Sequence, residues 1–219
     1  MSKHLSTLLL AWICLWASNA AAQSITLQPA LGGIVMSNGT SIQSISSNFT
    51  GQLDEGTQIN AWYLFNLPSS QQPIGAAVLS FEGAAMGRID RTYALLFSDV
   101  NSDLEVLKSS PSGSDTFADL QEGTSYGSLL VTQGAYSLPI DSAILQAAQQ
   151  GPGYLAVGIS NVSARALVPD GLFDNGVVLT AVSLELTLTA VPEPHAILLL
   201  SVGIVAVHRR PQSRHLKEA

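Results

Sequence analysis

The chain has 219 residues, of which 11% are charged and 47% are hydrophobic. This length lies at the upper edge of one β-rich domain, so we expect one domain with appendages. All four histidines and the one cysteine lie near the two ends, at His4, Cys14, His195, His208 and His215. Residues 23–191 thus contain neither histidine nor cysteine. This segment therefore cannot form a Ser–His–Asp triad, a Cys–His pair, a His or Cys zinc site or a disulfide bond.

Residues 23–191 are also strongly acidic. Four basic and fourteen acidic residues give this segment a formal net charge of −10. Nucleic-acid binding needs clustered lysine and arginine, so we expect no nucleic-acid partner. The same charge argues against adhesion of this segment to an anionic lipid surface.

Residues 1–22 have the pattern of a secretory signal peptide. Lys3 supplies the positive start, residues 5–16 are mostly apolar, and residues 20–22 are alanines that form a cleavage site before Gln23. The alternative is an uncleaved anchor, but the apolar stretch is shorter than the roughly 20 residues that span a bilayer. The sequence therefore predicts export and cleavage.

Residues 23–191 are predicted to form an all-β domain, because short apolar runs alternate with turn residues. Residues 182–189 alternate strictly between apolar and polar, which indicates one buried and one solvated face. The Ser- and Thr-rich residues 37–50 are expected at an exposed edge or loop. Strands are predicted at residues 61–67, 75–82, 92–98, 104–108, 126–132, 154–160 and 177–189.

One short helix is predicted to begin at Asp141. The Asp141 side chain can cap it, and Gly151 ends it. Ile144, Leu145 and Ala148 share one face. The predicted fold is an antiparallel, jelly-roll-like β-sandwich with this one helix, between an N-terminal signal peptide and a C-terminal hydrophobic tail helix.

Asp99, Asn101 and Asp103 carry oxygen ligands at alternate positions, as calcium loops do. An EF-hand loop would also need Gly at its sixth position and Glu at its twelfth, where this chain has Leu104 and Ser110. We favour a polar hairpin between two strands. We therefore predict no metal site and no cofactor, and keep these three residues as weak calcium candidates.

A glycosidase would need two carboxylates flanking the scissile bond. The spacing of the acidic residues selects no such pair, so we predict no catalytic residues and no enzyme. The available glutamates are Glu55, Glu82, Glu105, Glu122 and Glu185.

Aromatic side chains could instead stack on a sugar. Trp62 and Tyr63 are adjacent on a predicted strand and face opposite sides, so one can serve the core while the other meets the surface. Core packing is favoured for each aromatic candidate. The candidates are Trp62, Tyr63, Tyr126, Tyr136 and Tyr154.

Residues 192–219 form a three-part tail. Pro192-Glu193-Pro194 is followed by the apolar run 196–207 and then by Arg209-Arg210. Twelve helical residues cover roughly 18 Å, which is short of a hydrocarbon core of roughly 30 Å. The two arginines lie where the positive-inside rule places the cytoplasm. A plain single-pass tail anchor is the alternative.

This tail resembles the PEP-CTERM sorting signal of bacterial exosortase substrates. The resemblance implies a membrane-embedded processing enzyme as partner, a precursor held in the membrane through residues 196–207, and cleavage near Pro192-Glu193-Pro194. It makes these three residues and Arg209-Arg210 the sorting signal. Residues 118–160 also resemble secreted β-sandwich domains of PEP-CTERM proteins, through 118–120, 123–127, the helix at Asp141 and 154–158.

The expected protein is therefore exported, anchored in the membrane as a precursor, and then delivered to the cell surface or extracellular matrix. It is expected to be non-enzymatic. The alternative is a carbohydrate-binding module with extracellular polysaccharide as its partner. The predicted organisation is a signal peptide at 1–22, a β-sandwich domain at 23–191 and a sorting tail at 192–219.

Overall fold

The computed structural model describes residues 22–53, 56–69, 72–87, 91–100, 104–109, 113–163 and 175–189. Within it, Ser24–Leu188 form one compact unit. The predicted sorting tail lies outside the described residues, and so does the predicted signal peptide up to residue 21. Within the described ranges, no helix is long and apolar enough to cross a membrane.

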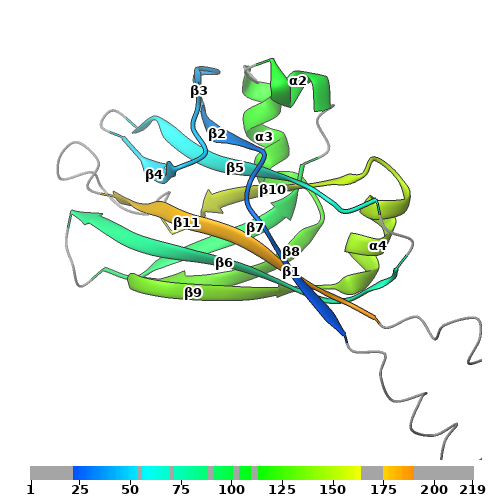
Figure 1. The fold of residues 1–219 in the computed structure, drawn as a ribbon. Coiled ribbons are helices and arrows are strands. Elements are labelled where there is room, and N and C mark those ends of the chain that lie inside the picture. Colours follow the sequence, from blue (N-terminus) through cyan, green and yellow to red (C-terminus); the bar gives the residue numbers. More distant parts are fainter. Residues whose placement is uncertain are drawn as a thin grey trace, which may run out of the picture. The chain divides into compact units, whose positions relative to one another are not determined.

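Most of the described chain is β-strand, and the strands form one hydrogen-bonded sheet (Figure 1). The strands are β1 (Gln23–Leu27), β2 (Leu31–Met36), β3 (Ser41–Gln43), β4 (Ser47–Gln52), β5 (Gln58–Asn66), β6 (Ile74–Gly87), β7 (Tyr93–Asp99), β8 (Ser125–Val131), β9 (Gln133–Ile140), β10 (Tyr154–Asn161) and β11 (Asn175–Leu188). The helices are α2 (Leu104–Lys108), α3 (Ser114–Glu122) and α4 (Ser142–Gln150).

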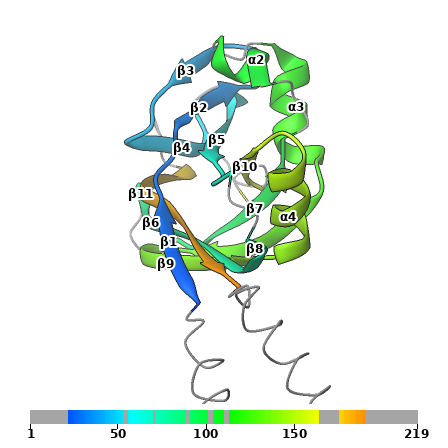
Figure 2. The same ribbon diagram turned by 45° about the vertical axis from the view of Figure 1, so that its right-hand side comes forward.

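The main path of the sheet runs β8-β7-β10-β5-β4-β11-β6-β9, and every step is antiparallel. Its two end strands, β8 and β9, follow one another in the chain with Thr132 between them. The sheet therefore curls back on itself until it is nearly barrel-like (Figure 2). Off this path, β1 pairs with β11, and β2 pairs with β3 and β5. The prediction of an all-β, antiparallel fold is confirmed.

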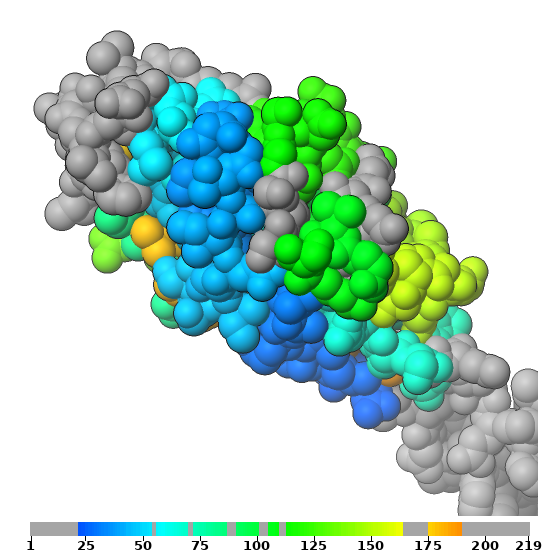
Figure 3. All heavy atoms as spheres, turned by 90° about the horizontal axis from the view of Figure 1, so that it is seen from above, coloured from blue at the N-terminus to red at the C-terminus, as the bar shows by residue number. Residues whose placement is uncertain are grey.

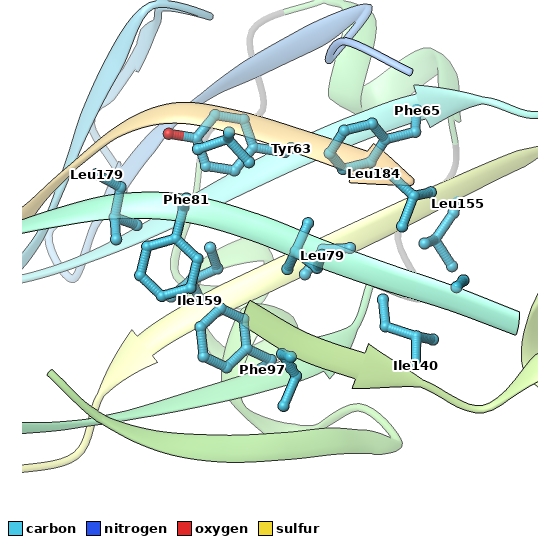
Figure 4. Packing of buried hydrophobic residues seen from close by; sticks show 14 of the residues in the cluster. Tyr63, Phe65, Leu79, Phe81, Phe97, Ile140, Leu155, Ile159, Leu179 and Leu184 are labelled. Atoms are coloured by element: carbon cyan, nitrogen blue, oxygen red, sulfur yellow. The ribbon is translucent and has the colours of Figure 1, made fainter. Parts of the chain in front are cut away.

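The main core lies inside the curl, where alternate residues of the strands meet. Tyr63 of β5, Phe81 of β6 and Phe97 of β7 are among its buried side chains (Figure 4). The rings of Phe81 and Phe97 have centroids 5.6 Å apart. On β11, Leu184 and Leu186 are fully buried, as the apolar–polar alternation predicts.

A second core lies on the outer face of β5 and β10, beneath α3. Trp62 packs there with Leu120 of α3 and Ala156 of β10. The helix lies close to the sheet: a Cβ added to Gly158 would be 2.9 Å from the carbonyl oxygen of Leu120. Both Trp62 and Tyr63 are therefore 0% exposed. Core packing, the interpretation favoured for each of them, is confirmed, because α3 covers the face opposite the main core.

Residues 104–108, predicted as a strand, form helix α2, and α3 is a helix that the periodicity does not predict. The described residues therefore contain three helices rather than one. Of the residues of α2 with described burial, only Leu107 is buried, and Glu105 and Lys108 form an exposed ion pair at 3.0 Å. A segment of five residues in which one side chain is known to be buried is compatible with either periodicity. Figure 3 shows α2 and α3 beside strands β2–β4 on one face, where Gln43 Nε2 donates to the Lys108 carbonyl oxygen at 3.1 Å.

The Ser- and Thr-rich residues 37–50 contain strand β3 and the first four residues of β4. The expectation of an exposed edge holds for β3, whose one partner among the described strands is β2. It is wrong for β4, where Asn48 and Thr50 are buried. Asn48 Nδ2 donates to the Ser44 carbonyl oxygen at 2.8 Å, and Thr50 Oγ1 lies 3.2 Å from the Ile59 carbonyl oxygen. These bonds let polar side chains enter the interior.

Candidate functional site

A cavity of about 410 Å³ opens beside α4, where β7 ends and where β8 and β10 begin. Its volume is within the range of small-molecule sites. Its polar groups come from Asp99, Thr124, Tyr126 and Tyr154. Its apolar wall comes largely from α4 and the turn that follows.

Asp99 reaches the cavity because two chain segments meet closely at the end of β7. The Asp99 N–H donates to the Thr124 carbonyl oxygen at 2.8 Å. Residue 123, which precedes Thr124, must be glycine, because a Cβ on Gly123 would lie 2.1 Å from the Asp99 carbonyl oxygen. This contact brings the start of β8 against the end of β7 and places Tyr126 beside Asp99.

Tyr126 and Asp99 are directly hydrogen-bonded. The Tyr126 hydroxyl donates to Asp99 Oδ1 at 3.0 Å, and it lies 3.4 Å from the Ala156 carbonyl oxygen. Burial, the negative charge of Asp99 and this hydrogen bond together raise the pKa of Tyr126 well above its ordinary value. Tyr126 is therefore a neutral hydrogen-bond donor at physiological pH.

Helix α4 supplies the apolar wall, and the sequence predicts it correctly. The Asp141 side chain accepts a hydrogen bond from the Ala143 N–H at 2.9 Å, and Leu145 is fully buried. Gln146 Nε2 donates to the Ile74 carbonyl oxygen at 2.9 Å, which fixes the helix against β6. The cavity side carries small or aliphatic side chains, namely Ile144, Ala147 and Ala148, followed by Pro152.

The charge of the cavity is negative. Asp99 is the one ionic side chain among its described lining residues, which include no lysine, arginine or histidine. An anionic ligand would meet an uncompensated carboxylate there. In this cavity, the Asp99 carboxylate can accept hydrogen bonds from a ligand, and the hydroxyl groups can donate or accept them. The aromatic rings and α4 can contact an apolar surface of the ligand.

Of the three calcium candidates, Asp99 lines the cavity, whereas Asn101 and Asp103 lie outside the described residues. Across the described ranges, no group of three His, Cys, Asp or Glu residues could hold a metal ion. The sorting-signal residues are likewise outside the described part of the chain; they are Pro192, Glu193, Pro194, Arg209 and Arg210.

The described glutamates occupy separate places. Glu105 pairs with Lys108 on α2, and Glu185 accepts a hydrogen bond from Ser24 at 2.7 Å. Glu82 lies on β6 next to β11, but it is opposite Thr180 rather than Glu185. Glu122 ends α3, and Glu55 is outside the described residues.

Two of the five aromatic candidates, Tyr126 and Tyr154, line the cavity. Trp62 and Tyr63 are core residues, and Tyr136 packs on Phe81 with ring centroids 5.6 Å apart. The sequence singles out Asp99 as a calcium candidate and Tyr126 and Tyr154 as sugar-stacking candidates. It does not predict that the three residues line one cavity. It also places Ile144 and Ala148 only as helix-packing residues, and it gives no signal that Ala147 lines a cavity.

No protein-family model matches the chain, and no curated protein matches it. Among solved structures, the K3 cleaved adhesin domain of Lys-gingipain from Porphyromonas gingivalis is 10% identical, with a TM-score of 0.31 over 63% of this chain and 71% of that one. BuGH86 in complex with neoagarooctaose is 11% identical, with a TM-score of 0.28 over 75% of this chain and 30% of that one. Both TM-scores are too low to indicate a shared fold.

Proposed function

We propose that the chain is an exported, non-enzymatic protein of the cell surface or extracellular matrix, sorted through a PEP-CTERM-type tail. One observation carries the proposal: Pro192-Glu193-Pro194, the apolar run 196–207 and Arg209-Arg210 follow one another in the order of that signal. The signal peptide at 1–22 supplies the export that such a tail requires. The partner is an exosortase-type processing enzyme, and residues 196–207 hold the precursor in the membrane.

The geometry of the β unit supports this proposal. Its first strand, β1, pairs with its last strand, β11, and Ser24 Oγ donates to Glu185 Oε1 at 2.7 Å. The start of β1 and the end of β11 consequently lie together at one end of the sheet (Figures 1 and 2). A precursor held by either flanking segment would therefore be held at the same end of the β unit.

We also propose that the β unit is a jelly-roll-like sandwich, because the curled sheet encloses the main core between facing strands (Figure 2). A cleaved signal peptide precedes it, and a hydrophobic tail helix follows it.

Replacement of Pro192, Glu193 and Pro194 by alanine tests the sorting step. The native chain should be exported and shortened at its C-terminus, whereas the triple variant should accumulate as a membrane-bound precursor. Pro211→Ala is the matched control, because it removes a proline of the same tail outside the motif and should be processed normally. Cell fractionation and gel mobility measure both. Cytoplasmic retention of the native chain, or equal processing in a strain without the exosortase, would contradict the proposal.

A further inference from the structure

We propose that the cavity beside α4 is a binding site for a neutral pyranose unit of a saccharide. The inference goes beyond the sorting proposal and does not depend on it. It rests on a carboxylate, a hydrogen-bonded phenol, aromatic rings and small apolar side chains that together line about 410 Å³.

The polar side of the cavity suits vicinal hydroxyl groups. A carboxylate has about four lone-pair sites, and the Tyr126 hydroxyl occupies one of those on Asp99. Asp99 can therefore accept further hydrogen bonds from ligand hydroxyls, and bonds to an ionised acceptor are stronger than neutral ones. The hydrogen bond to Tyr126 also restricts the carboxylate before a ligand arrives, which lowers the entropy cost of binding.

The apolar side suits the C–H face of a sugar ring. Tyr126 and Tyr154 are half-buried, so their rings can contact a ligand at the cavity. Other groups that line the cavity are small, namely Ala147, Ala148 and Pro152. Small side chains leave room for a ring, and a larger side chain at Ala147 would occupy that room.

The charge of the cavity selects the ligand class. The single carboxylate disfavours phosphates, sulfates and sugar acids. A quaternary ammonium ion is the remaining competitor, because carboxylates and aromatic rings both attract cations. Cages for such ions surround the cation with aromatic faces, whereas the α4 side of this cavity carries Ile144, Ala147 and Ala148. This aliphatic wall favours the pyranose.

Saturation-transfer difference NMR on the full chain tests the site, with the protein in a polyoxyethylene detergent that lacks a sugar headgroup. The probes are the methyl glycosides of glucose, galactose, mannose and N-acetylglucosamine, with tetramethylammonium as the competing cation. At least one glycoside should bind. Asp99→Asn should weaken it about tenfold, the loss expected for one charge-assisted hydrogen bond. Ala147→Phe should abolish binding.

Each variant has a matched control on α4 outside the cavity lining. Asp141→Asn changes the same chemical group and keeps a good helix cap, and Ala143→Phe adds the same ring at an exposed position. Both controls should bind like the native chain. Circular dichroism checks folding, and if Ala147→Phe does not fold, Asp99→Asn decides. Absence of binding by all four glycosides, binding unchanged in Asp99→Asn, or binding of tetramethylammonium alone would overturn the proposal.

Discussion

Tyr63 lies in the middle of β5 with its side chain fully buried. Burial raises the pKa of its phenol from 10.0 to about 12, against a smaller lowering by the Asn48 side chain. The raised pKa means that the folded protein holds the Tyr63 proton more tightly than the unfolded chain does. Stability from this group is therefore complete below pH 10 and is lost as the pH rises toward 12.

We predict that Tyr63→Phe reduces the alkaline loss of stability. Between pH 10 and 12, the native chain should lose roughly 2 kcal/mol more unfolding free energy than the variant, because phenylalanine has no proton to release. Urea unfolding followed by circular dichroism at both ends of this range measures the difference. Equal alkaline losses in Tyr63→Phe and the native chain would contradict the burial of this phenol.

At the scale of elements, α3 turns the outer face of β5 and β10 into a second core. Ser98 Oγ donates to the Leu120 carbonyl oxygen at 3.1 Å, and Asn60 Nδ2 donates to the Phe117 carbonyl oxygen at 3.2 Å. Leu120 itself is 0% exposed in the cluster with Trp62. The helix is therefore fixed to the sheet by both hydrogen bonds and apolar packing.

Leu120→Ala should cost about 2–5 kcal/mol of unfolding free energy, because it leaves a cavity beneath α3. Leu130→Ala makes the same chemical change at a side chain that is 70% exposed on β8. Its cost should stay within about 0.5 kcal/mol. Chemical denaturation of both variants provides the comparison. Equal costs would show that α3 does not cover a core.

An element can be predicted from the sequence when the residues that determine it lie within its own segment. Helix α4 carries its own cap, apolar face and stop, so the sequence predicts it from Asp141 to Gly151. Helix α2 has five residues and one residue known to be buried, which leaves its period undetermined. The hydrophobic periodicity does not predict strand β4, because its buried residues Asn48 and Thr50 are polar. Their burial becomes favourable through hydrogen bonds that form in the folded protein.

The candidate site could not be predicted from the sequence, because its residues meet only through the tertiary structure. Asp99 and Tyr126 are 27 residues apart, and their contact depends on the antiparallel pairing of β7 with β8 and on the close approach at Gly123. The residues named from sequence include Asp99, Tyr126 and Tyr154, but their meeting is a property of the topology. Trp62 shows the converse, because an aromatic residue suited to a surface platform is covered by a helix that the periodicity does not predict.

At the scale of the whole β unit, its first and last strands are neighbours and α4 lies at the same end. Ile74 accepts the hydrogen bond from Gln146 of α4 and pairs with Leu188, the last residue of β11. Both proposed targeting segments would thus attach at the end of the unit that carries the cavity wall. We propose that these segments direct export and sorting and are then removed.

The intact mass of the mature protein, isolated from the surface or medium of its native host, shows whether both segments are removed. We predict a mass that corresponds to a chain beginning at Gln23 and ending near Pro192-Glu193-Pro194, without Arg209 and Arg210. In a strain that lacks the exosortase, the mass should include the whole tail. A mature protein that retains residues 196–219 in the presence of the enzyme would contradict the claim.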